Sequence, residues 1–279
     1  MFPRNSSNSL IMDSGLSYEL LDVAFGTLVG ISLGLTGGGG SIFAVPLLTY
    51  GLGVPIGTAL GLSLASVGAT AGFGAALRLR AREIELQAGV IFSLVGMVMA
   101  PIGALIGHRI APAILLSAFA VMMGYAGIRM WRGRRDASAK PGPCVTQDHG
   151  KFTGGCYAML SIAGAVSGLL SGLFGVGGGF VIVPSLLYAG IGIHRAVATS
   201  LMVIFLISVS GVVANIIQGQ HVPVRVTSLF VGGCLAGMLA GSALRSRLSG
   251  SALQKTFAAA MWLVAVFMLA KNLSTFLPH

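Results

Sequence analysis

The sequence contains very few charged side chains. Only 9% of its 279 residues are Asp, Glu, Lys or Arg, whereas 55% are hydrophobic. A water-soluble domain needs about a quarter of its residues charged to cover its surface, so a soluble fold is excluded. A disordered chain is also excluded, because disordered chains combine low hydrophobicity with high net charge. The composition therefore predicts an all-α integral membrane protein that lies in a lipid bilayer.

Motifs for metals, nucleotides and catalysis are missing as well. The three cysteines, Cys144, Cys156 and Cys234, show no CxxC spacing, and we expect them to be small packing residues. No HExxH, GxGxxG or GxxxxGK[ST] motif occurs, so we expect no metal, no cofactor and no nucleotide-driven pump. In a membrane protein the net charge of +10 reflects orientation in the bilayer, and no nucleic-acid partner is expected.

Glycine is abundant, with 42 residues, and it marks two interruptions in the apolar runs. About 20 helical residues cross a bilayer, so charge-free runs of 55 and 43 residues at 23–77 and 152–194 must turn within or beside the membrane. Each of these runs contains a glycine cluster followed by a proline, and we expect helix breaks at Pro46 and Pro184. The other runs predict single spans, at 86–108, 110–128, 196–224, 226–244 and 256–270.

The chain contains an internal repeat. At a shift of 138 residues, Gly26–Tyr50 matches Gly164–Tyr188 at 11 of 25 positions. The predicted organisation is an N-terminal tail (1–17), a first transmembrane repeat (18–132), a polar linker (133–151) and a second transmembrane repeat (152–279). Each repeat should consist of a Gly-rich broken or re-entrant hairpin followed by three transmembrane helices. Because the first hairpin opens from outside and the second from the cytoplasm, the two repeats are expected to have inverted topology.

The basic residues predict the orientation. Thirteen of the 17 Lys and Arg residues fall in the segments 78–82, 129–151, 194–195 and 245–255, which share one side of the membrane in this topology. By the positive-inside rule that side is cytoplasmic. We therefore expect a multi-pass protein of the cell inner (plasma) membrane, with the linker 133–151 in the cytoplasm and both termini outside.

The residues also resemble a known family. The elements GLTGGGG…P at Gly34–Pro46 and GLFGVGGGF…P at Gly172–Pro184, their duplication and the basic loop between them are similar to the TauE/SafE sulfite exporter family. The similarity runs from about residue 20 to residue 272. It implies a membrane transporter for sulfite, an organosulfonate or a related sulfur-containing anion.

The glycine clusters are the expected anion site. Consecutive glycines leave several backbone N–H groups unbonded, and a helix that follows them directs the positive end of its dipole at the same point. The alternative interpretation of the glycine clusters is a flexible hinge that does not contact a ligand. Buried hydroxyl and amide groups can complete the coordination of an anion, although a Ser or Thr in a membrane helix more often bonds the preceding turn. The predicted substrate-binding residues are Gly37, Gly38, Gly39, Gly40, Ser41, Gly175, Gly177, Gly178, Gly179, Ser63, Thr199, Ser200 and Asn215, with Ser66 as a further hydroxyl.

Charged groups near the span ends lead to two further expectations. Arg195 follows the second hairpin and is a candidate anion gate, although snorkelling to the interface is the default explanation of such a residue. All seven Asp and Glu residues are expected outside the spans, which disfavours a carboxylate proton relay. Outward movement of an anion needs no such proton relay, because the membrane potential supplies about 2.3 kcal/mol per charge per 100 mV.

These features favour a secondary transporter, working as an exporter by alternating access, over any enzyme. The first alternative is an anion channel, and the next is an intramembrane enzyme or a non-transporting assembly protein. The expected partners are a small anion and the lipid bilayer, and a homo-oligomer is left open.

Overall fold

The computed structural model describes residues 7–131, 154–219, 224–244 and 250–276, and in these ranges it contains helices and no strands. The first half consists of α1 (Ser7–Thr36), the 3₁₀ turn η1 (Gly39–Phe43), α2 (Ala44–Pro46), the π-helical turn η2 (Leu47–Gly51), α3 (Ile56–Arg80), α4 (Leu86–Arg109) and α5 (Pro112–Trp131). The second half consists of α6 (Gly154–Phe174), α7 (Gly179–Tyr188), α8 (Ile193–Ile217), α9 (Val224–Leu244) and α10 (Gly250–Phe276). The linker 133–151 and the N-terminal residues 1–6 lie outside the described residues.

Six of the described helices are long and apolar enough to cross a membrane, namely α1 from Glu19 onward, α3, α4, α6 (from Gly155), α8 and α9 (from Arg225). The prediction of an all-helical membrane protein is confirmed. Local residues explain several helix ends: Pro55 precedes α3, and Pro112 opens α5, where the missing N–H of proline costs nothing. The positive charges of Arg78 and Arg80, in the last turn of α3, interact favourably with the negative end of the helix dipole.

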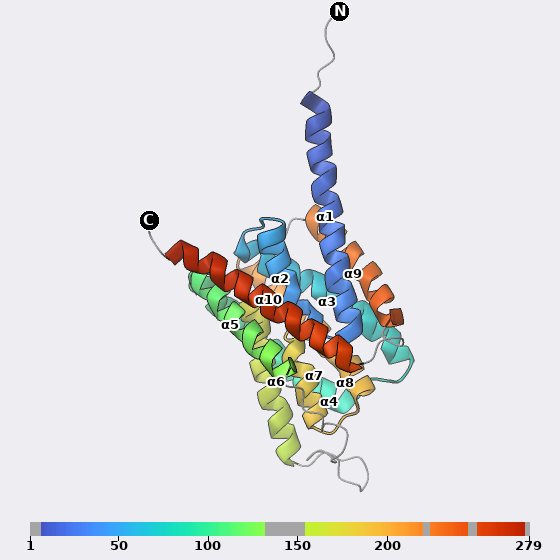
Figure 1. Cartoon of the computed structure of the whole chain (residues 1–279). Helices are drawn as coiled ribbons and strands as arrows, with labels where there is room; N and C mark the ends of the chain where they lie inside the picture. Colours follow the sequence, from blue (N-terminus) through green and yellow to red (C-terminus); the bar gives the residue numbers. More distant parts are fainter. Residues whose placement is uncertain (1–6, 132–153, 220–223, 245–249, 277–279) are drawn as a thin grey trace, which may run out of the picture.

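The two halves interlock. Helix α1 of the first half packs against α9 of the second, and α6 of the second packs against α4 of the first. In Figure 1, α9 runs beside α1, and the N-terminal part of α1 projects beyond the other helices. Small residues make this packing close, because a Cβ atom on glycine would collide with the backbone of the partner helix. These glycines are Gly26, Gly30 and Gly34 against α9, Gly233, Gly237 and Gly241 against α1, and Gly103, Gly164, Gly168 and Gly172 between α4 and α6.

The contacts also give the relative directions of the central helices. Gly26 meets Phe230 and Gly34 meets Met238, so α1 and α9 run parallel. Gly68 meets Ser208 and Gly74 meets Leu201, so α3 and α8 run antiparallel at the centre of the molecule. Helices α3 and α8 are equivalent in the sequence repeat.

The pair α5 and α10 lies across the two interruptions. Helix α10 runs obliquely over the other helices with α5 beside it (Figure 1). Phe257 of α10 packs on Phe43 with ring centroids 6.1 Å apart, and Phe119 of α5 packs on Phe174 at 5.4 Å. Asn272 ties the pair together by donating hydrogen bonds to the Ala113 carbonyl (2.7 Å) and to the Ser117 hydroxyl (2.6 Å).

Two cysteines lie among the described residues. Cys234 is a free, buried thiol where α9 meets α1, as expected for a packing residue. Cys156 is disulfide-bonded, so the packing interpretation is wrong for it. A pairing cannot be inferred from spacing alone, because it depends on how the chain brings two distant cysteines together.

We predict that Gly30→Ala destabilises the protein by about 1–3 kcal/mol, because its new methyl group would collide with the Cys234 carbonyl. Gly232→Ala is the matched control: nothing lies within 4 Å of a Cβ at this exposed helical glycine, so the change should be neutral or stabilise by up to ~1 kcal/mol. Thermal unfolding in detergent measures both. Equal melting temperatures for the two variants would contradict the close α1–α9 contact.

Candidate functional site

The first interruption is a short glycine loop in which three backbone groups bond neighbouring hydroxyls. Gly37 has a φ of 74° and ends α1, and its carbonyl accepts a hydrogen bond of 2.6 Å from the Ser200 hydroxyl of α8. The Ser41 hydroxyl donates to the Gly38 carbonyl at 2.7 Å, and the Gly40 N–H donates to the Thr36 hydroxyl at 3.1 Å. The loop continues into an irregular helical segment, in which the 3₁₀ turn η1, the three-residue α2 and the π-helical turn η2 follow one another from Gly39 to Gly51.

The second interruption is a glycine loop that is followed directly by a regular α-helix. Gly175, Gly177 and Gly178 all have φ values between 65° and 71°, which only glycine adopts without strain. The Ser167 hydroxyl of α6 donates to the Gly178 carbonyl at 3.0 Å, and the ten-residue α7 begins directly after it. The positive end of the α7 dipole is therefore at this loop.

The two loops come together from opposite halves of the chain. A Cβ atom placed on Gly38 would lie 2.9 Å from the Cα of Gly179, so only glycine fits at this contact. Ile204 of α8 lies beside both loops, 3.0 Å from the Cβ positions of Gly38 and of Gly177. The convergence of the two clusters follows from the interlocked packing of the halves.

Backbone N–H groups at the two loops have no acceptor. Within the described part of the chain, the N–H groups of Gly38 and Gly39 in the first loop and of Val176, Gly177 and Gly178 in the second make no hydrogen bond to backbone or side chain. Buried N–H groups are almost always bonded, and such a cluster of donors is suited to an anion.

The loops are closed in this structure. A hollow beside the second loop has no room for a water molecule, and its lining is apolar: Val45, Ile56, Leu60, Leu115, Leu116, Phe119 and Phe174. It lies beside the second loop, since Leu60 contacts Gly175 and Phe174 precedes it. A ligand would therefore need these elements to separate.

Comparison with known proteins identifies the family. The model of the family described as "Sulfite exporter TauE/SafE" matches residues 23–268, which is most of the chain. The chain belongs to the TauE/SafE sulfite exporter family. Related proteins are a probable membrane transporter protein of Xylella fastidiosa (34% identical, covering 79% of this chain and 82% of that one) and the probable membrane transporter protein YdhB of Bacillus subtilis (29% identical, 74% and 82%). No solved structure matches. The family and its relatives indicate a membrane transporter and not an enzyme.

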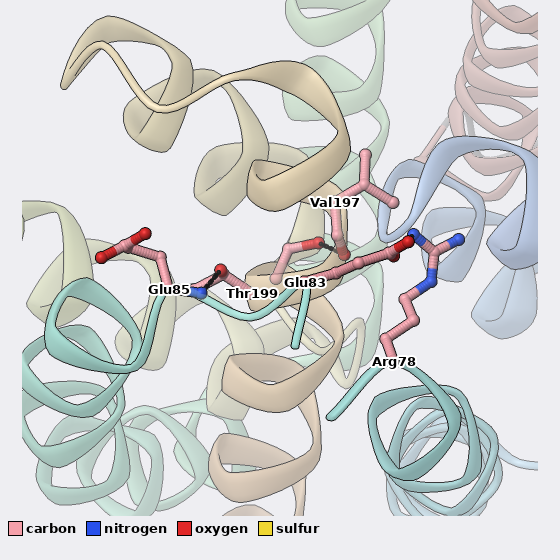
Figure 2. A network of polar contacts seen from close by, with 6 residues as sticks. Arg78, Glu83, Glu85, Val197 and Thr199 are labelled. Carbon is pink, nitrogen blue, oxygen red and sulfur yellow. Dashed lines mark hydrogen bonds and ion pairs between the residues drawn. The ribbon is translucent and has the colours of Figure 1, made fainter. Parts of the chain in front are cut away.

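In this TauE/SafE protein, three of the predicted hydroxyl ligands already have structural partners, Ser41 in the first loop and two on α8. The Ser200 hydroxyl bonds Gly37, and the Thr199 hydroxyl accepts a hydrogen bond of 2.9 Å from the Glu85 N–H in the loop between α3 and α4. Figure 2 shows Thr199 bonded to this loop at Glu85, with the ion pair between Arg78 and Glu83 (3.5 Å) nearby. These contacts attach the start of α8 to elements of the first half.

Asn215 lies away from the glycine loops. It stands 15 residues beyond Ser200 on α8, or about 22 Å along the helix axis. Its amide donates to the Gly211 carbonyl at 2.8 Å, and its carbonyl oxygen is 3.1 Å from Nε2 of His108. The structure therefore does not bring Asn215 together with the other predicted ligands.

The two prolines differ in their effect on the helices. Pro46 ends the three-residue α2 and is followed by a π-helical turn, whereas Pro184 lies inside α7. The expectation of a break at Pro184 is wrong. Proline removes only one N–H from a helix, whereas the positive φ values of Gly175, Gly177 and Gly178 are incompatible with a right-handed helix.

The acidic residues do not all lie outside the spans. Asp22 is only 6% exposed and lies in α1, within the apolar segment Glu19–Thr36. The charge-free run begins at residue 23, but α1 begins at Ser7, so its membrane-long segment includes Asp22. Arg195, the candidate gate, forms an ion pair of 3.2 Å with Glu85, and its side chain is 65% exposed. Among the described residues, no cluster of ligating side chains could hold a metal.

Sequence reasoning missed two buried serines beside the second loop. Ser171 of α6 and Ser208 of α8 are fully buried, and their hydroxyls have no hydrogen-bond partner in the part of the chain that the structure describes. The signal for Ser208 was its spacing, because Ser200, Ile204 and Ser208 recur every four residues on one helix face. Ser171 precedes Gly175 by the same spacing.

We predict that Ser200→Ala lowers the free energy of unfolding by about 1–3 kcal/mol, because the buried Gly37 carbonyl loses its donor. Ser185→Ala is the control, since that hydroxyl only bonds the Val181 carbonyl one turn back. Thermal unfolding in detergent compares the two. A Ser200 variant as stable as the Ser185 variant would show that this hydroxyl does not hold the first loop.

Proposed function

We propose that the protein is a secondary transporter that exports a small sulfur-containing anion, such as sulfite or an organosulfonate, by alternating access. The observation that carries this proposal is the meeting of two glycine loops, one from each half, at Gly38 and Gly179. Their unbonded N–H groups suit an oxyanion. The family model carries the name of sulfite exporters, and the identity of the anion is our extension of that name to this chain.

The proposed arrangement in the membrane is a pair of inverted repeats. Equivalent elements related by a two-fold axis in the membrane plane run in opposite directions, and the antiparallel pair α3 and α8 agrees with such an axis. The glycine loops then lie near the midplane, where broken helices bind substrates in many transporters. We place the cytoplasm on the side of Arg78 and Arg195, both termini outside, and the protein in the inner membrane, as the basic residues favour.

Access from the cytoplasm would require the start of α8 to separate from the loop between α3 and α4. The contacts there are weak ones: an exposed Arg195–Glu85 ion pair and one hydrogen bond to Thr199. An exposed ion pair contributes about 0–1 kcal/mol, so it can open and close during transport. Opening frees the guanidinium of Arg195 to attract an incoming anion, which is the gating role proposed for it.

The direct test is efflux from proteoliposomes loaded with sulfite, with potential and proton gradient set separately by ionophores. We expect saturable efflux that is accelerated by an interior-negative potential and persists without a proton gradient, because one charge gains about 2.3 kcal/mol per 100 mV. Asp22→Asn should retain this efflux. Flux that needs a proton gradient and is lost in a folded Asp22 variant would replace our mechanism with proton coupling, and unsaturable flux would indicate a channel.

Gly179→Ala should abolish efflux, because its methyl group would collide with the backbone of Gly38 and keep the two loops from closing. Gly192→Ala serves as the control, since nothing lies within 4 Å of a Cβ at that position and its φ is −58°. Both variants are compared by efflux per correctly folded protein, judged by gel filtration. Normal efflux in a folded Gly179 variant would contradict a transport cycle that depends on loop closure.

A further inference from the structure

The two glycine loops differ in how their surroundings are bonded. The first loop is surrounded by hydroxyls that already have partners on its backbone: Thr36, Ser41 and Ser200. The second loop is contacted by α3, α6 and α8, through Leu60 and Val67, Ser167, and Ser208 respectively. These three helices carry four of the five buried hydroxyls that lack a partner among the described residues, namely Ser63, Ser66, Ser171 and Ser208; the fifth is Thr49 of η2.

The repeat makes this difference easy to see. At a shift of 137, Val197 corresponds to Leu60 and Ser200 corresponds to Ser63. Val197 and Leu60 occupy the same position in each half, since Val197 contacts Gly37 and Leu60 contacts Gly175. Ser200 donates to its loop, at the Gly37 carbonyl, but the Ser63 hydroxyl makes no hydrogen bond to any described residue. The hydroxyl that closes the first loop is therefore left free at the second.

Ser208 is the most informative of the free hydroxyls. It is fully buried in the middle of α8, and its Oγ lies 3.6 Å from the position of a Cβ on Gly177. It therefore lies beside Gly177, whose N–H group, like that of Gly178, has no acceptor among the described residues. The repeat places Ala71 at the corresponding position of α3, so the first loop has no equivalent donor. A buried hydroxyl without a partner is costly, and a ligand that accepts its hydrogen bond would remove that cost.

We propose that the second loop holds the anion and that the first loop is its cover. In this assignment, which rests on the function proposed above, Ser208, Ser171 and the N–H groups of Gly177 and Gly178 donate hydrogen bonds to the anion, with Ser63 completing the set from α3. Gly38 of the first loop closes over Gly179 once the anion is bound. Neutral donors that converge from several helices suit an oxyanion with three oxygens, such as sulfite or the head of a sulfonate, better than a halide.

The test measures how sulfite raises the melting temperature of the purified full-length protein, with chloride as the comparison ion. We expect Ser208→Ala and Ser171→Ala to melt at or above the wild-type temperature without sulfite, because each loses a hydroxyl that lacks a partner. Their half-saturating sulfite concentration should rise about tenfold, the effect of losing one hydrogen bond to a charged ligand. Ser93→Ala is the matched control, since its buried hydroxyl bonds the Gly89 carbonyl within its own helix, and it should behave as the wild type.

The outcomes separate this proposal from the function on which it rests. If sulfite stabilises the wild type but Ser208→Ala and Ser171→Ala respond at the same concentration as the wild type, the assignment to the second loop is wrong and the transporter function stands. If sulfite neither stabilises the wild type nor leaves loaded proteoliposomes, the proposed function itself fails. Should Ser208→Ala not fold, Ser171→Ala and Ser63→Ala decide the question in the same way. Equal stabilisation by chloride would overturn the preference for an oxyanion.

Discussion

The structure depends on the close approach of polypeptide backbones where no side chain fits between them. Without water in the hydrocarbon region, helices gain little from burying apolar side chains and associate by close packing. Here that packing relies on glycines along α1, α4, α6 and α9, and it joins each half to the other rather than to itself. The meeting of Gly38 and Gly179 is the same kind of contact at the centre, made by loops instead of helices.

The contact at the centre also explains why the loops can carry both binding and motion. Glycine residues leave their N–H groups accessible and hold no side chain that must be repacked when they separate. The elements around them are attached by a few specific bonds, such as Ser200 to Gly37 and Ser167 to Gly178. The first loop is thus bonded to α8 and the second to α6, so movement of these two helices relative to each other moves the loops.

Much of the fold was predictable from sequence because charge and glycine mark it directly. The span predicted at 86–108 is α4 (Leu86–Arg109), and the helix predicted after the first hairpin is α3 (Ile56–Arg80). The candidate site was only partly predictable. Ser63 and Ser200 look equivalent in the repeat, yet one hydroxyl is free and the other is bonded, a difference that depends on tertiary contacts. The burial of Asp22 was missed for a similar reason, since burial within a packed helix leaves no local mark in the sequence, whereas Ser208 could have been found from its four-residue spacing to Ile204 and Ser200.

The pairing of α1 with α9 has a consequence for synthesis. The glycine face of α1 is complete at Gly34, whereas its partner begins only at Val224. At translation rates of about 5–20 residues per second, the intervening chain takes roughly 10–40 s to emerge. For that time the glycine face of α1 lacks the helix that it packs against in the finished protein. The α1–α9 contact can therefore form only late in biogenesis, after most of the polypeptide has been made.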